Sequence, residues 1–239
     1  MLDQKEEVKV SDRLDALRAA DYGKSVRILN DTYLLKSTCD NLRFGNAYVI
    51  KGKNSKNLVL IDAVKREHRD ELLRFRESGH NILAIILTSS DLVGQAYTEL
   101  SDIARELNTQ IYIHPMDSAM THTVDITGYH NFLQEFDLTV FHMPGYTNGS
   151  IVIHSGATQA LFTGNSAVGS PYERNDYFLN RPILDDQEDD MVLQESWKSI
   201  CVDFEHILPS RGKPQFDIDF KRKEIIIQQL TKLEQTKTL

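Results

Sequence analysis

A short polar segment directly after an apolar run carries the side chains best placed for chemistry. Ile82 to Leu87 consists entirely of Ile, Leu and Ala, which indicates a strand covered on both faces. Ser89, Ser90 and Asp91 follow it, ahead of apolar positions at helical spacing between Leu100 and Leu107. Because α/β proteins place their chemistry where a strand ends near a helix start, these hydroxyls and this carboxylate are candidate site residues.

Two serines in such a loop suggest one kind of chemistry, a Ser-based hydrolase. A Ser nucleophile needs a base within hydrogen-bond reach and an acid that orients the base. His142, expected at the end of another strand, and Asp91 are the available partners for Ser89 or Ser90. The chain contains no Gly-x-Ser-x-Gly turn, so capping hydroxyls are the more ordinary interpretation of these serines.

Further segments along the chain follow one another in the order of a known family's landmarks. They include a strand ending in Asp, a strand with a His-Pro exit, a His-x-Pro-Gly-x-Thr-x-Gly-Ser loop, a strand ending in Gly-Asn, and a Leu-Pro-x-x-Gly closing segment. These landmarks are Leu58–Asp62, Ile111–Pro115, His142–Ser150, Leu161–Asn165 and Ile207–Gly212. In this respect the chain resembles the metallo-β-lactamase fold hydrolases from about residue 45 to about residue 215.

The resemblance also implies where metal ligands belong. The family carries a Thr-His-x-His-x-Asp-His-x-Gly-Gly loop whose His and Asp side chains hold one or two metal ions. Here Asp91 and Gly94 match that loop, whereas Ser89 and Leu92 stand where two histidines belong. At the remaining ligand positions, the replacements are Tyr146 for a histidine, Asn165 for a bridging carboxylate and Arg211 for the last histidine.

These replacements argue against a metal centre. Zinc or iron needs at least three converging N, O or S ligands, and only Asp91 is a good ligand at a ligand position. Arg211 is a permanent cation, so it cannot ligate a metal and would repel one. We therefore predict that Arg211 takes over the charge of the metal and lies within salt-bridge distance of Asp91.

Three functions remain open. The first is a metal-free pseudoenzyme without cofactor, which binds a small polar or anionic ligand or a protein partner. The second is a metallohydrolase with non-standard zinc or iron ligands, and the third is the metal-independent Ser hydrolase with Ser89, Ser90 and His142 as candidate catalytic residues. The expected ligand pocket consists of Ser89, Asp91, His142, Tyr146, Asn165 and Arg211.

Composition narrows the possible partners. The 239 residues include 27 basic and 35 acidic side chains, a net charge of −8, and no segment concentrates Lys and Arg as a nucleic-acid groove would. The two cysteines, Cys39 and Cys201, are isolated and form no metal-ligand spacing. Without an apolar leader or a long apolar run, the sequence indicates a soluble, cytoplasmic protein with no nucleic-acid or membrane partner. An N-terminal or outer helix offers a surface for a homodimer.

The same periodicities predict the architecture. We expect one α/β domain over residues 1–239, an αββα sandwich of two mixed β-sheets flanked by helices. An N-terminal helical extension at about 1–25 and a C-terminal helix at about 219–236 complete it. The expected strands are 26–29, 32–35, 47–50, 58–61, 82–87, 111–114, 138–142, 151–154 and 160–163.

Two local expectations concern charge and burial. His68 shares a helix face with Val64, Leu72 and Phe75, which indicates a half-buried packing histidine on a helix that ends at Gly79. Asp185–Asp190, the only charge run, lacks the spaced pattern of a calcium loop and is expected to be a solvated loop.

Overall fold

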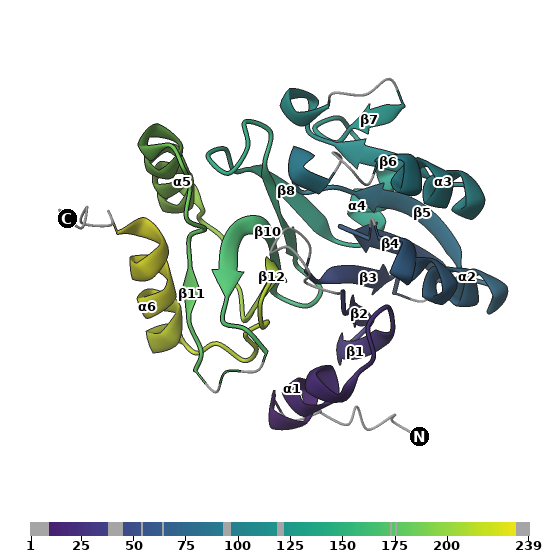
Figure 1. Cartoon of the computed structure of the whole chain (residues 1–239), viewed down its shortest axis with the longest axis horizontal. Coiled ribbons are helices and arrows are strands. Elements are labelled where there is room, and N and C mark those ends of the chain that lie inside the picture. The colour runs from purple at the N-terminus through teal and green to yellow at the C-terminus, as the bar shows by residue number, and fades with distance from the viewer. Residues whose placement is uncertain are drawn as a thin grey trace.

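Two β-sheets stack face to face, and helices cover the outer side of each (Figure 1). The computed structural model describes residues 10–37, 45–53, 55–63, 65–92, 97–118, 122–172, 174 and 176–232. Val64, Gly94 and Cys39 therefore lie outside the described residues. No helix in the described ranges is long and apolar enough to cross a membrane.

The first sheet has seven strands that lie side by side in sequence order. The first four pair antiparallel in succession, and each of the later three runs parallel to the strand before it. Helices α2 (Arg69–Glu77) and α3 (Tyr97–Leu107) make the crossovers. The strands are β1 (Ser25–Leu29), β2 (Thr32–Leu35), β3 (Ala47–Lys51), β4 (Asn57–Ile61), β5 (Asn81–Ile86), β6 (Gln110–Ile113) and β7 (Thr123–Asp125).

The second sheet contains the antiparallel order β11-β10-β9-β8, with β12 paired in parallel to β10. Its strands are β8 (Leu138–His142), β9 (Ile151–Ser155), β10 (Ala160–Gly169), β11 (Leu179–Asn180) and β12 (His206–Arg211). The outer helices are α5 (Gln187–Ser199) and α6 (Phe220–Thr231); α1 (Val10–Ala19), α4 (Asn131–Glu135) and the 3-10 turns η1 (Arg66–His68), η2 (Ser90–Leu92) and η3 (Pro115–Asp117) complete the chain. Both sheets mix parallel and antiparallel pairs, so the predicted αββα sandwich is confirmed.

The apolar core lies in three layers, as a four-layer sandwich requires. Between the sheets, the rings of Tyr48 and Phe162 meet edge to face with centroids 5.1 Å apart. A second cluster lies under α2 and α3, and a third under α5 and α6 includes the only tryptophan, Trp197. Leu14 and Leu17 of α1 join the central cluster, so this helix packs on its own chain.

A buried carboxylate ties the two sheets together at the ends of their strands. Asp62 follows β4, and its Oδ1 accepts a hydrogen bond from the Thr88 amide at 2.9 Å. Its Oδ2 accepts from the Thr88 hydroxyl at 2.8 Å and from the Ser210 hydroxyl of β12 at 2.6 Å. Thr88 in turn accepts a bond from the Ile151 amide of β9 at 2.9 Å, so one carboxylate positions segments of both sheets.

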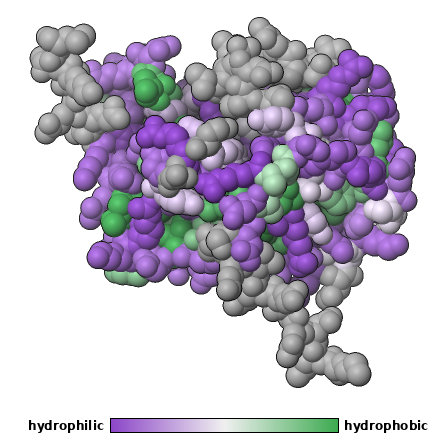
Figure 2. Space-filling model, turned by 60° about the horizontal axis from the view of Figure 1, so that its bottom comes forward, coloured by the Kyte–Doolittle hydropathy of each residue, from purple (hydrophilic) through white to green (hydrophobic). Residues whose placement is uncertain are grey.

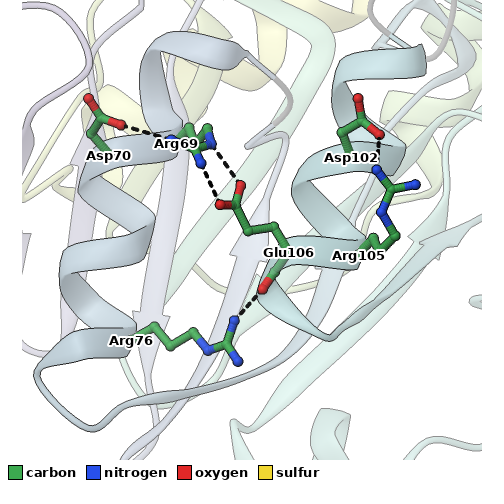
Figure 3. A network of polar contacts seen from close by, with 6 residues as sticks. All are labelled: Arg69, Asp70, Arg76, Asp102, Arg105 and Glu106. Carbon is green, nitrogen blue, oxygen red and sulfur yellow. Dashed lines mark hydrogen bonds and ion pairs between the residues drawn. The ribbon is translucent and has the colours of Figure 1, made fainter.

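Charged side chains join α2 and α3 on the outer surface (Figure 3). Arg69 grips the Glu106 carboxylate with two guanidinium nitrogens, and Arg76 donates to the backbone oxygen of the same residue. Arg105 pairs with Asp102 one turn earlier on α3. Partly exposed pairs of this kind contribute little individually; Arg69 and Arg76 link the two helices, whereas the Arg105–Asp102 pair lies within α3.

Hydrophilic side chains dominate the face drawn in Figure 2, where hydrophobic ones form small separate patches. Large exposed apolar side chains of the described residues include Ile183, which is 94% exposed, and Met116, which is 63% exposed. Scattered residues of this kind are ordinary on protein surfaces.

Two local predictions were wrong. Asp185–Asp190 is exposed over residues 185–189, as expected, but it is not a loop, because α5 begins within it: the Asp186 carboxylate caps the Glu188 amide at 2.8 Å, and Asp190 pairs with the buried guanidinium of Arg181. Carboxylates at this end complement the helix dipole. His68 is fully buried rather than half-buried, since it lies in η1 ahead of α2 and bonds the Ser37 hydroxyl at 2.6 Å.

Segment ends also differ from the expected ones. The strand predicted to end at Thr163 continues to Gly169, because β10 pairs with β9 at its start and with β11 at its end. The last helix begins at Phe220 and ends at Thr231, where Lys232 takes an extended conformation, and the predicted continuation over 233–236 lies outside the described residues.

The buried imidazole of His68 gives stability a specific pH dependence. Burial, followed by the nearby Lys65 charge, lowers the pKa of His68 to about 3. Below pH 6.5, the ordinary pKa of histidine, His68 is protonated in the unfolded chain but stays neutral in the folded chain. The contribution of His68 to the free energy of unfolding therefore falls as the pH drops from about 6.5 towards 3. We expect the difference in unfolding free energy between the native protein and His68→Gln to shrink by up to about 1.4 kcal/mol per pH unit as the pH is lowered from 6.5 to 4.5.

Urea denaturation at several pH values measures this difference, and a difference constant with pH would contradict the assignment. His80→Gln, at a partly exposed position, is the matched control and should give a smaller slope.

The Asp62 cross-link predicts a graded loss of stability. Asp62→Ala leaves three buried donors without their acceptor, so we expect a loss of about 3 kcal/mol or more. Ser210→Ala removes only one of the three bonds and should cost about 1 kcal/mol. Denaturant melts of both variants provide the test; equal costs would mean that the carboxylate does not work as the shared acceptor.

Candidate functional site

Three side chains from distant segments meet where the strands of both sheets end. Asp91 comes from η2, Tyr146 from the loop between β8 and β9, and Arg211 from the end of β12. The Tyr146 hydroxyl donates to Asp91 Oδ2 and accepts a 2.8 Å bond from Arg211 Nη2, which lies 3.7 Å from the same carboxylate oxygen. The predicted Arg211–Asp91 salt bridge is therefore confirmed, and the trio is called the clasp below.

The clasp keeps its phenol neutral. Burial, followed by the hydrogen bond that the phenol donates to Asp91, raises the pKa of Tyr146 well above its ordinary value. The hydroxyl thus remains a donor to the carboxylate and an acceptor for the guanidinium over the whole physiological pH range. Arg211 and Asp91 supply one positive and one negative charge, so the clasp as a whole is electrically balanced.

Two polar side chains of the predicted pocket are buried without partners. Ser89 is 1% exposed and Asn165 is 2% exposed, and neither the Ser89 hydroxyl nor either amide atom of Asn165 has a hydrogen-bond partner in the described part of the chain. The Arg211 Nε is in the same condition. Buried polar atoms without partners are costly, so these positions are where a bound polar group would gain most.

Strand register explains why these residues gather. The β10–β12 pairing sets Gly164 opposite Pro209 and Val168 opposite Arg211, so Asn165 belongs to the stretch beside the end of β12. A Cβ on Gly164 would lie 2.3 Å from the Thr88 hydroxyl, so the backbone there touches the segment that precedes Ser89. The two sheets therefore deliver Ser89 and Asn165 to the same end of the sandwich.

A second buried carboxylate anchors the loops that carry the clasp. Asp117 of η3 is 5% exposed, and it accepts hydrogen bonds at 2.7 Å from the amides of Ser90 and Gly149. The Thr147 hydroxyl donates to it as well. A Cβ on Gly149 would lie 2.7 Å from Asp117, so the loop can approach this closely only because residue 149 is glycine.

His142 and Ser90 make separate contacts in this structure. His142 is exposed, its Nε2 donates to the Asn148 carbonyl at 2.8 Å, and its ring stacks on His114. Ser90 uses its backbone amide to bond Asp117. Among the described residues, no hydrogen bond joins His142 to Ser89, Ser90 or Asp91, so a Ser-His-Asp relay is not formed in this structure.

A polar cavity of about 330 Å³ opens beside the loop between β8 and β9, which carries Tyr146. Its lining combines carboxylates with amide and hydroxyl groups, from Ser90, Met116, Asp117, Gly145, Thr147, Asn148 and Asp189. Sequence reasoning missed Asp117 and Asp189. The signal for Asp117 was its place two residues after the His-Pro exit, and Asp189 was hidden in the charge run interpreted as a loop.

The side chains present do not fit a zinc or iron centre of the family type. The Asp91 carboxylate is occupied by Tyr146 and Arg211, and a guanidinium cannot ligate a metal. Within the ranges that the structure describes, no three His, Cys, Asp or Glu side chains converge closely enough to hold an ion.

Solved structures of metallo-β-lactamase fold proteins resemble this chain. The B3 metallo-beta-lactamase BLEG-1 is 18% identical with a TM-score of 0.54, over 75% of this chain and 91% of its own. ETHE1 from Myxococcus xanthus is 14% identical with a TM-score of 0.58, over 87% of this chain and 84% of its own. TTHA1623 in a di-iron-bound form is 20% identical with a TM-score of 0.51, over 76% of this chain and 92% of its own.

No protein-family model matches the chain, and neither does any curated protein sequence. The structural likenesses therefore establish the fold, and the chain has the metallo-β-lactamase fold that its motifs resemble.

A double-mutant cycle tests the energetic coupling in the clasp. We expect Arg211→Met and Asp91→Asn to show a coupling free energy of about 0.5–1 kcal/mol in urea denaturation, because both groups are only partly shielded from water. The exposed Arg105–Asp102 pair on α3 is the control and should couple more weakly. Strict additivity at the clasp would show that the contact carries no stability.

Proposed function

We propose that this chain is a metal-independent binding protein, a pseudoenzyme on the metallo-β-lactamase fold, whose clasp region receives a small polar or anionic ligand or a polar group of a protein partner. The observation that carries the proposal is the Arg211 guanidinium, bonded to Tyr146 and close to Asp91. This permanent cation holds Asp91 and Tyr146 without a metal, so a positive and a negative group are kept at defined positions in the site.

The chemistry of the clasp favours ligands rich in hydrogen-bond acceptors. A guanidinium binds carboxylate or phosphate oxygens through charge-assisted bonds in a planar fork. The Ser89 hydroxyl and the Asn165 amide offer further donors, and the Asn165 carbonyl offers one acceptor. The oxygens of such a ligand would replace the Asp91 carboxylate beside Arg211. The displaced carboxylate would turn towards solvent, to which the Asp91 side chain is already 44% exposed.

The nearby cavity limits what the ligand can be. At about 330 Å³ it suits a small molecule or one side chain, and its Asp117 and Asp189 carboxylates would repel a second anionic group. We infer that the ligand carries a single oxyanion for Arg211 and a neutral or hydrogen-bond-donating remainder.

A metallohydrolase with relocated ligands is the second candidate, since TTHA1623, a fold neighbour, is described in a di-iron-bound form. A Ser-based hydrolase that uses Ser89 or Ser90 is the third.

Two measurements on the same protein separate these candidates. Metal analysis of untagged protein, expressed with zinc and iron supplied, should find far less than one metal ion per chain. Thermal melts with acetate, inorganic phosphate and short hydroxy acids at pH 7.5 should show stabilisation by at least one of them, which amounts to about 2.7 kcal/mol at a hundred times its dissociation constant.

Matched variants locate the binding. Arg211→Met should abolish the ligand-induced shift in Tm, whereas Arg105→Met, on the exposed face of α3, should retain it. Near-stoichiometric metal would overturn the proposal in favour of the metallohydrolase. Ester turnover that resists chelator and disappears in Ser89→Ala or Ser90→Ala would overturn it in favour of the Ser hydrolase.

A further inference from the structure

Two imidazoles stack against each other at the start of the 143–150 loop, which carries Tyr146 of the clasp. His114 follows β6 and is 8% exposed, while His142 ends β8 in the other sheet and is exposed. Their ring centroids lie 4.2 Å apart with an angle of 3° between the planes. A contact of this kind holds only while at most one ring is charged, because two stacked imidazolium cations repel each other.

Hydrogen bonds in this structure show which ring nitrogen of each histidine carries a proton and which does not. His114 Nδ1 accepts a 3.3 Å bond from the Met116 amide and so caps η3, which requires an unprotonated nitrogen there. His142 Nε2 lies 2.8 Å from the Asn148 carbonyl, which can only accept, so this nitrogen carries a proton. A proton added to His114 Nδ1 would point at the Met116 N–H and break the cap.

The cap matters because η3 carries Asp117. The Asp117 amide bonds the His114 carbonyl at 2.9 Å, and its carboxylate holds the amides of Ser90 and Gly149. Ser90 directly precedes Asp91, and Gly149 lies three residues after Tyr146. One short turn therefore holds both loops that deliver side chains to the clasp.

The charges around His114 set when it titrates. Burial and the His142 ring lower the pKa of His114, whereas Asp117 on η3 and Asp125 on β7 act in the opposite direction. Burial is the largest contribution, and the net effect is a lowered pKa. His130, whose ring meets that of Tyr112 edge to face, bonds the Asp125 carbonyl at 2.7 Å.

We propose that the stacked His114–His142 pair is a proton-operated latch, which holds the clasp loops closed at neutral pH and releases the 143–150 loop in mild acid. Protonation of His114 removes the cap of η3 and places a cation against the His142 ring. Once η3 is destabilised, Asp117 holds the amides of Ser90 and Gly149 less firmly, so both loops that lead to the clasp are weakened. The inference rests on the proposed function in one respect: release of the loop would expose Arg211 and so regulate ligand binding at that site.

The direction follows from proton linkage. In the opened state His114 has its ordinary pKa, near 6.5, and in the closed state its pKa is lower. The opened state therefore binds more protons below pH 6.5, and the population of open molecules should rise by up to tenfold per pH unit as pH falls. Above that pH the latch adds no further pH dependence.

Amide hydrogen exchange of the full chain, without ligand, tests the latch. Exchange rates of residues 88–92 and 143–150, corrected for the intrinsic effect of pH, should show about tenfold less protection at pH 5.5 than at pH 7.5. Amides of β5 serve as the internal reference, since global destabilisation through His68 would affect them as well.

Substitutions at residue 114 separate the latch from a merely structural role. His114→Asn keeps an acceptor that caps η3 but cannot titrate, so protection should remain high and independent of pH. His114→Ala removes the cap and should leave the loop open at both pH values. His80→Asn, a control outside this region, should respond as the native protein does.

Two results would overturn the latch: loop protection in the native protein that does not change with pH, or an unchanged acid response in His114→Asn. Because this experiment uses no ligand, its failure leaves the ligand-binding result at pH 7.5 standing, and a negative binding result leaves the latch standing.

Discussion

The structure depends first on a buried carboxylate that both sheets share. Asp62 accepts hydrogen bonds from Thr88, which follows β5, and from Ser210 on β12. Burial raises its pKa to about 6, so at neutral pH its charge is maintained by these three donors. The ends of β5 and β12 are the segments from which Asp91 and Arg211 project.

The clasp provides partners for polar and charged side chains that the fold brings together. Loops from both sheets converge at one end of the sandwich, and they bring polar side chains together there, some of which are buried. In the resembled family, metal ions can neutralise such a region. Here a guanidinium, a carboxylate and a neutral phenol form a balanced set of hydrogen bonds and charges. In the part of the chain that the structure describes, the Ser89 hydroxyl and the Asn165 amide have no hydrogen-bond partner, and leaving buried polar groups in that state is costly.

Around the clasp, the anchoring is uneven. Asp62 and Thr88 are buried and held by several short bonds, whereas the 143–150 loop depends on Asp117, on the stacked imidazoles and on its packing against α5. A Cβ on Gly145 would lie 2.4 Å from Leu193 of that helix, so the loop backbone touches α5 directly at this residue. Under the proposed latch, the outer loop would open while the buried segments stay in place.

The fold could be predicted from the sequence, because five spaced motifs and the apolar strands between them are local patterns. It also predicted the Arg211–Asp91 contact, since both residues stand at positions whose convergence is a property of the fold. Other features could not be predicted from local patterns. The burial of His68, the helix cap at Asp186 and the anchoring role of Asp117 depend on which segments pack against them. Periodicity records whether a side chain is apolar and not which neighbour satisfies a polar one, so these roles appear only when distant segments meet.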